Sequence, residues 1–203
     1  MNKQIFVKWL KINTLCFMGA FIIALLVALL FPDIMRGFIG RWIKLSFTVV
    51  PLVLEPTTKK ALFTGIFVRN SISVLVFFIG SVLLAAPILM TISGVFFPLA
   101  FVTLIDCGLP FWYTIILIAI ESAFFIITAT FASTLGTEIF GIKPERKQLF
   151  EYWKKDITKL WYWPKQERNW KIVFKENKKE LILFSVVILA LLLFGAWFEV
   201  WGY

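Results

Sequence analysis

One carboxylic acid, Glu121, lies near the middle of an otherwise apolar run from Leu109 to Leu135. If this run crosses a membrane, a charge exposed to lipid at that depth costs several kcal/mol. Thr114 and Thr128 lie seven residues on either side of Glu121, and Ser122 follows it. Small and polar residues on one helix face mark the side that packs against other helices. We therefore expect Glu121 to point into a helical bundle.

Three interpretations of Glu121 remain open. It is a structural group hydrogen-bonded to a neighbour such as Arg69 or Asn70, or it is protonated, or it belongs to a path for protons, ions or a substrate. Glu199, at the end of the last apolar run, is either an ordinary exposed charge or a residue that faces a partner or the path.

The sequence contains no residue set typical of an enzyme. Histidine, the commonest general base and transition-metal ligand, is absent. No GxSxG, HExxH, Walker or glycine-rich phosphate-binding motif is present. We therefore predict a protein that is not an enzyme and has neither a cofactor nor a metal.

The elements that must position these residues are membrane helices. Hydrophobic residues make up 60% of the chain, against about 45–50% in ordinary globular proteins, and the charges cluster between long apolar runs. We predict one all-α domain, a polytopic membrane bundle of about five transmembrane helices. The expected spans are about residues 14–31, 70–87, 91–106, 110–135 and 181–199.

The second and third spans come from one run of 36 residues, 70–105, without any charge. A single helix of that length would measure ~54 Å, much more than the hydrocarbon thickness. The run must fold back, and Pro87, Ser93-Gly94 and Pro98 are the available breakers. Whether these two short helices cross fully or are re-entrant stays open.

The segment 33–56 is expected outside the spans, at the outer interface. Its first part is amphipathic, with Trp42 among apolar residues on one face and Arg36, Arg41 and Lys44 on the other. Either an interfacial helix or an ordinary packed amphipathic helix has this pattern.

Lysine and arginine predict the orientation. Of 21 basic residues, 3 lie in the N-terminal tail, 6 in residues 31–70 and 12 in residues 143–180. With five spans, the tail and the loop 137–180 share one side, which the positive-inside rule assigns to the cytoplasm. We predict a multi-pass cell-membrane protein with its C-terminus outside. Because the cations flank the spans, we do not expect a nucleic-acid partner.

The loop 137–180 also contains candidate binding residues. A basic amphipathic helix there suits either anionic lipid of the cytoplasmic leaflet or a partner such as a cytosolic ATPase. The candidate residues are Trp153, Lys154, Lys155, Lys159, Trp161 and Trp163.

Several short motifs, taken in order, resemble the stage II sporulation protein M family over most of the chain. They are Ile66-Phe67-Val68-Arg69-Asn70, Gly80, Ser93-Gly94, Glu121-Ser122-Ala123, Gly136 and Ala196-Trp197-Phe198-Glu199. Two positions depart from the family pattern. The family's Asn-Gly is Ser93-Gly94 here, and the Pro-His-Gly that often precedes the Glu is Pro110-Phe111-Trp112. If that histidine partners the glutamate in relatives, this chain has lost the pair, which puts a proton-linked role of Glu121 in doubt.

The resemblance implies a non-catalytic membrane protein. Relatives in circular-bacteriocin gene clusters accompany an ATP-binding export protein, so one hypothesis is a permease-like subunit that acts with an ABC-type ATPase on a hydrophobic peptide. The alternative is a scaffold that recruits envelope-remodelling proteins, as in sporulation. Other membrane subunits and further copies of the chain are possible partners under both hypotheses.

Overall fold

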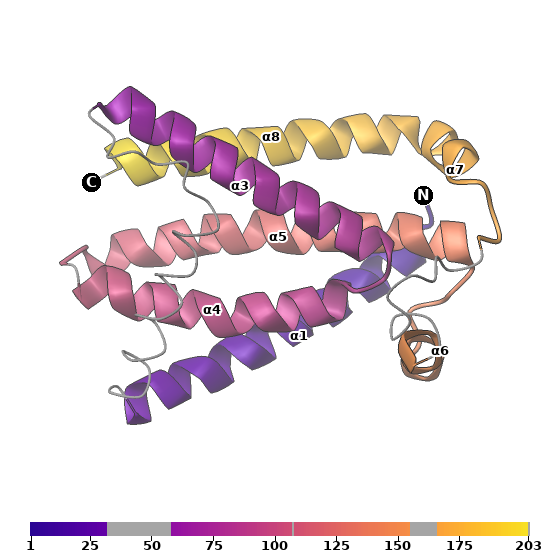
Figure 1. The fold of residues 1–203 in the computed structure, drawn as a ribbon, viewed down its shortest axis with the longest axis horizontal. Helices are drawn as coiled ribbons and strands as arrows, with labels where there is room; N and C mark the ends of the chain where they lie inside the picture. Colours follow the sequence, from indigo (N-terminus) through magenta and orange to yellow (C-terminus); the bar gives the residue numbers. More distant parts are fainter. Residues whose placement is uncertain (32–57, 107, 155–165, 203) are drawn as a thin grey trace.

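A computed structural model describes residues 1–31, 58–106, 108–154 and 166–202 of the chain. The helices are α1 (Lys3–Leu30), α3 (Lys59–Val82), α4 (Ala86–Asp106), α5 (Phe111–Phe140), α6 (Arg146–Tyr152), α7 (Trp170–Glu176) and α8 (Lys178–Trp201). The five long helices lie side by side along one axis (Figure 1). This confirms the predicted all-α bundle, and the predicted interfacial segment 33–56 lies outside the described residues.

The helix lengths agree with a membrane protein. Helices α1, α3, α5 and α8 are long and apolar enough to cross a membrane. Helix α4 has 21 residues, of which Ala86–Val102 form a shorter apolar stretch. At 1.5 Å per residue, 21 residues measure ~32 Å, close to the ~30 Å of a hydrocarbon core. Full crossing by α4, and with it a total of five spans, stays a prediction.

Helix α5 is the centre of the bundle. It contacts α1 and α4 on one side and α3 and α8 on the other (Figure 1). All residues from Thr128 to Thr137 are buried. Small residues allow this close packing: a Cβ atom on Gly136 would collide with the carbonyl oxygen of Val82 at the end of α3.

The charge-free run folds back as predicted, but the turn lies at residues 83–85, before Pro87. Leu84 forms the turn with a φ of +60° and is fully buried. Pro87 is the second residue of α4, where a missing N–H costs little. Gly94 lies inside α4 and not at the turn. A glycine is required there, because a Cβ atom would collide with the carbonyl oxygen of Phe17 in α1. Gly94 therefore marks a helix–helix contact and not a turn.

Two helices start well before the spans expected from the charges. Helix α1 begins at Lys3 and α3 at Lys59, each eleven residues before the expected spans at 14 and 70. Side-chain caps set these starts, since Asn2 and Thr58 accept hydrogen bonds from backbone N–H groups of the first turns. The helices therefore extend well beyond the charge-free runs. Arg69 consequently lies in the middle of α3.

The N-terminus of α1, the C-terminus of α5 and the N-terminus of α8 lie at one end of the bundle with α6 and α7 (Figure 1). We call this the basic end, because the described Lys and Arg residues of the tail and of residues 143–179 lie there. The Met1 amino group lies 3.3 Å from Glu180 Oε1, which joins the first and last helices. The tail and the loop therefore share one end, and its cytoplasmic location stays a prediction.

Candidate functional site

Four of the residues predicted to lie inside the membrane come together between α3, α5 and α8. Asn70 of α3 lies within hydrogen-bonding reach of the Glu121 carboxyl, and the charges of Arg69, Glu121 and Glu199 act on one another. We call Arg69, Asn70, Glu121 and Glu199 the carboxylate cluster. The three helices contact one another pairwise. The Asn70–Glu121 neighbourhood agrees with the structural interpretation of Glu121, and a role in a path stays a prediction.

The helix directions explain how the two carboxyl groups approach each other. Helix α5 runs toward the basic end, whereas α8 runs away from it (Figure 1). Side chains in helices tilt toward the N-terminus of their own helix. Glu121 therefore leans away from the basic end and Glu199 leans toward it. This tilt brings together two carboxyls whose backbones lie at different depths.

Tyr113, which the sequence analysis did not single out, anchors the last turn of α8 to α5. Its hydroxyl donates to the carbonyl oxygens of Phe198 at 3.1 Å and Glu199 at 2.9 Å. Its ring stacks on Phe198 with the centroids 4.9 Å apart. These carbonyls belong to the last turn of α8, where carbonyl groups run out of N–H donors within the helix; the Phe198 carbonyl also accepts from the Gly202 N–H at 2.9 Å. Tyr113 thereby fixes the backbone that carries Glu199.

Glu199 is partly buried and is therefore not an ordinary exposed charge at a helix end. Its Oε2 atom is buried without a hydrogen-bond partner among the described residues. Among the described residues, the carboxylate cluster contains two carboxyl groups and one guanidinium group. The guanidinium belongs to Arg69, an exposed residue. Full charge balance needs either a proton on one carboxyl or a second cation. The cluster can thus accept a proton or a positively charged group.

The predicted polar stripe of α5 is buried. Thr114 and Thr128 are fully buried and Ser122 nearly so. The Thr114 hydroxyl donates to the Pro110 carbonyl oxygen at 3.2 Å, whereas Thr128 Oγ1 has no hydrogen-bond partner among the described residues. Each threonine is seven residues, ~10 Å along the axis, from Glu121. They flank the carboxylate cluster and do not belong to it.

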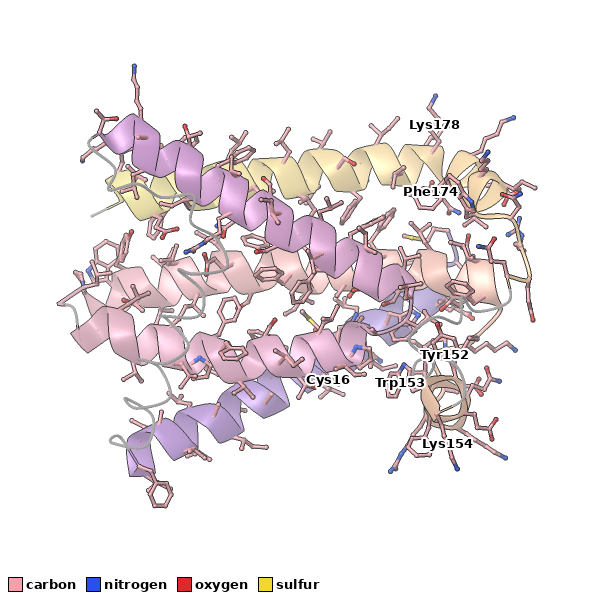
Figure 2. All side chains as sticks on the ribbon, viewed as in Figure 1. Cys16, Tyr152, Trp153, Lys154, Phe174 and Lys178 are labelled. Carbon is pink, nitrogen blue, oxygen red and sulfur yellow. The ribbon has the colours of Figure 1, made fainter. Side chains whose placement is uncertain are left out.

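Trp153 is half-buried and packs its indole N–H against the protein, whereas its predicted contact with lipid or a partner stays a prediction. Its indole N–H donates to the Leu84 carbonyl oxygen at 3.0 Å, and the Tyr152 hydroxyl donates to the Leu83 carbonyl oxygen at 3.1 Å (Figure 2). The buried turn offers carbonyl groups that need donors, which explains why α6 packs there. Lys154 is exposed. The other predicted residues, Lys155, Lys159, Trp161 and Trp163, lie outside the described residues.

The first helix contributes two buried polar contacts that the sequence analysis also missed. The Trp9 indole donates to Thr137 Oγ1 at 2.8 Å, and the Asn13 amide donates to Thr130 Oγ1 at 3.3 Å. The only sequence feature that could have indicated these contacts is Asn13, a polar residue four positions after Trp9 and therefore on the same helix face. These contacts fix the first turns of α1 against α5.

No group of three or more Cys, Asp or Glu residues that could hold a metal ion occurs in the described part of the chain. Comparison with known proteins gives no match: neither a family model, nor a curated protein, nor a solved structure is similar to this chain. The resemblance to the stage II sporulation protein M family therefore stays a prediction.

Proposed function

We propose that this chain is a non-catalytic, permease-like subunit of the cell membrane that acts with a cytosolic ATPase in the export or maturation of a hydrophobic peptide, such as a bacteriocin. In this proposal the basic end faces the cytoplasm. The carboxylate cluster faces the path of the peptide or the subunit that completes the path.

The carboxylate cluster is the observation that carries the proposal. Glu121 and Glu199 lie within the helical bundle, and Glu199 Oε2 lacks a partner among the described residues. Ionisable groups at membrane depth are costly, and they commonly mark ion and substrate paths or contacts with other subunits.

The contact between α6 and the α3–α4 turn supports coupling to a cytosolic partner. Tyr152 and Trp153 bind the carbonyl groups of this turn directly. Helix α3 ends at the same turn, and its residues Arg69 and Asn70 lie toward the other end of the bundle. A force applied at α6 by an ATPase would therefore reach the carboxylate cluster through one continuous helix.

The first test is purification of the tagged protein from its native membranes in a mild detergent, followed by mass spectrometry. We expect an ATP-binding protein to co-purify in a fixed ratio. A stable preparation without any ATPase would refute the proposal. Peptidoglycan hydrolases in place of the ATPase would instead identify the chain as a scaffold for envelope remodelling.

The second test addresses the carboxylate cluster in that purified complex. We expect Glu121→Gln and Glu199→Gln to lower the rate of ATP hydrolysis while the ATPase still co-purifies, because an amide keeps the shape but cannot carry the charge. Glu176→Gln, the same change at an exposed site of α7, is the control and should leave the rate unchanged. Wild-type rates in all three variants would show that Glu121 and Glu199 are structural.

A further inference from the structure

The short helix α7 presents a basic and aromatic surface at the basic end. The side chains of Trp170 and Ile172 are 49% and 52% exposed, whereas Val173 is fully buried. The Lys171 ammonium lies over the Trp170 ring, 5.6 Å from its centroid. In Figure 2, Lys178 lies on the outer side of α8. We call the following residues the α7 surface: Trp170, Lys171, Ile172, Lys175, Lys178 and Lys179.

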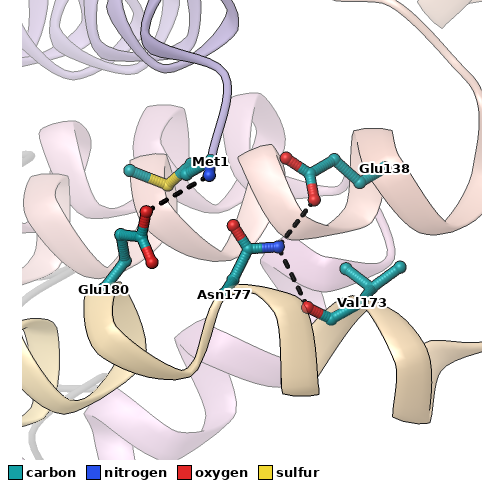
Figure 3. A network of polar contacts seen from close by, with 5 residues as sticks. All are labelled: Met1, Glu138, Val173, Asn177 and Glu180. Carbon is teal, nitrogen blue, oxygen red and sulfur yellow. Dashed lines mark hydrogen bonds and ion pairs between the residues drawn. The ribbon is translucent and has the colours of Figure 1, made fainter.

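Asn177 holds α7 in a fixed orientation. This residue interrupts the helix between α7 and α8, and it is 2% exposed. Its amide donates to Glu138 Oε2 of α5 at 2.7 Å and to the Val173 carbonyl oxygen at 2.9 Å (Figure 3). Val173 and Phe174 pack into the same hydrophobic core as the end of α5. The α7 surface is consequently held on the outside of the bundle.

The two acidic residues within and directly after the stretch Trp170–Lys179 are already paired. Glu176 pairs with Arg168 at 2.7 Å, and Glu180 pairs with the Met1 amino group at 3.3 Å. Within the described ranges, Lys171, Lys175 and Lys178 make no ion pair. The α7 surface therefore keeps an excess of positive charge over its immediate acidic neighbours.

The position of the α7 surface relative to the apolar stretch of α8 indicates which part of a membrane it would contact. The uncharged apolar stretch of α8 starts at Leu181, only three residues or ~4.5 Å after Lys178. Tryptophan and lysine at the boundary of an apolar helix sit at the level of the lipid headgroups. Anionic headgroups attract each nearby lysine, and this attraction falls within a Debye length.

We propose that the α7 surface binds anionic phospholipid headgroups and thereby sets the depth and rotation of α8. The loop pattern predicted contact with lipid or with a partner at Trp153 and at residues after it, and none of the α7 surface residues was among those candidates. The inference is independent of the proposed export function, since it concerns only the leaflet at the basic end.

The experiment uses the full chain with Cys16 and Cys107 replaced by Ser and a fluorescent label at Ile172→Cys. The protein is reconstituted into liposomes of phosphatidylcholine alone or with phosphatidylglycerol, each with a trace of nitroxide-headgroup lipid that quenches the label. We expect stronger quenching with phosphatidylglycerol and its loss at high salt. The triple variant Lys171→Gln, Lys175→Gln, Lys178→Gln should lower the docked-to-undocked ratio about 5-fold per lysine.

The matched control is Lys3→Gln, Lys8→Gln, Lys11→Gln, which removes three exposed lysines at the same end and should leave quenching unchanged. Native mass spectrometry gives a second readout without a label, and the α7 triple variant should retain fewer phosphatidylglycerol molecules than the control. Equal quenching in both lipid mixtures, or equal effects of the two triple variants, would overturn the proposal. So would a label that stays unquenched in both mixtures.

Discussion

Replacement of Gly94 by alanine tests the packing of α1 on α4. A Cβ atom at this position would lie 2.8 Å from the Ala20 Cβ atom and even closer to the Phe17 carbonyl oxygen. Both neighbours belong to α1, and a backbone carbonyl in a helix cannot rotate away. The two helices must therefore separate along their whole contact, and we expect Gly94→Ala to destabilise the bundle.

Gly19→Ala supplies the control and a way to isolate the magnitude. Gly19 lies in α1, and a Cβ atom there would meet nothing within 4 Å. Alanine gains about 1 kcal/mol over glycine in a helix interior, and this gain is common to both variants. The difference between them therefore measures the steric cost, which for overpacking is about 1–3 kcal/mol.

The assay is reversible unfolding in detergent micelles, followed by circular dichroism or by steric trapping. We expect Gly19→Ala to be as stable as the wild type or more stable, and Gly94→Ala to be less stable than Gly19→Ala by the stated difference. Equal stability of the two variants would show that α1 and α4 are not in the close contact described above. That result would also count against the described position of the α3–α4 turn at residues 83–85, because this position is what places Gly94 against α1.

Two further predictions concern single hydrogen-bonding groups, and unfolding in detergent measures both. Tyr113→Phe should keep the stacking on Phe198 and lose about 0.5–1.5 kcal/mol, because only the hydroxyl contact with the last turn of α8 disappears; an unchanged stability would argue against that contact. Asn177→Ala should cost about 1–3 kcal/mol, since it leaves the Glu138 carboxyl without its donor at a partly buried site. The double variant with Glu138→Ala should recover part of that loss, and purely additive effects would contradict the pairing.

The periodic and local features of this fold could be read from the sequence. A run of 36 uncharged residues cannot cross the membrane once, so the reversal between α3 and α4 followed from length alone. Thr114, Glu121 and Thr128 share one face of a single helix by their spacing, and the burial of the two threonines agrees with that placement. The charge pattern predicted that the N-terminal tail and the basic loop share one end, because helices that cross a membrane must alternate in direction.

The tertiary structure decided which distant residues meet. Glu121 and Glu199 are 78 positions apart (199 − 121), and no periodicity connects α5 with α8. Their proximity depends on the antiparallel packing of these helices and on the Tyr113 hydroxyl that holds the end of α8. In the sequence, Trp153 has the surroundings of an interfacial tryptophan. In the structure its indole N–H donates to a carbonyl group of the buried 83–85 turn.

Contacts between helices far apart in the chain also explain the role of Ser93-Gly94 and the orientation of the α7 surface. A glycine inside an apolar run indicates either a turn or a close helix contact, and only the position of α1 distinguishes them. In the sequence, Asn177 looks like an ordinary loop residue. In the structure its hydrogen bond to Glu138 fixes the direction of α7. The sequence by itself determined the helices, their apolar faces and their polar stripe. Only the packing of helices far apart in the chain determined the carboxylate cluster and the orientation of the lysines beside it.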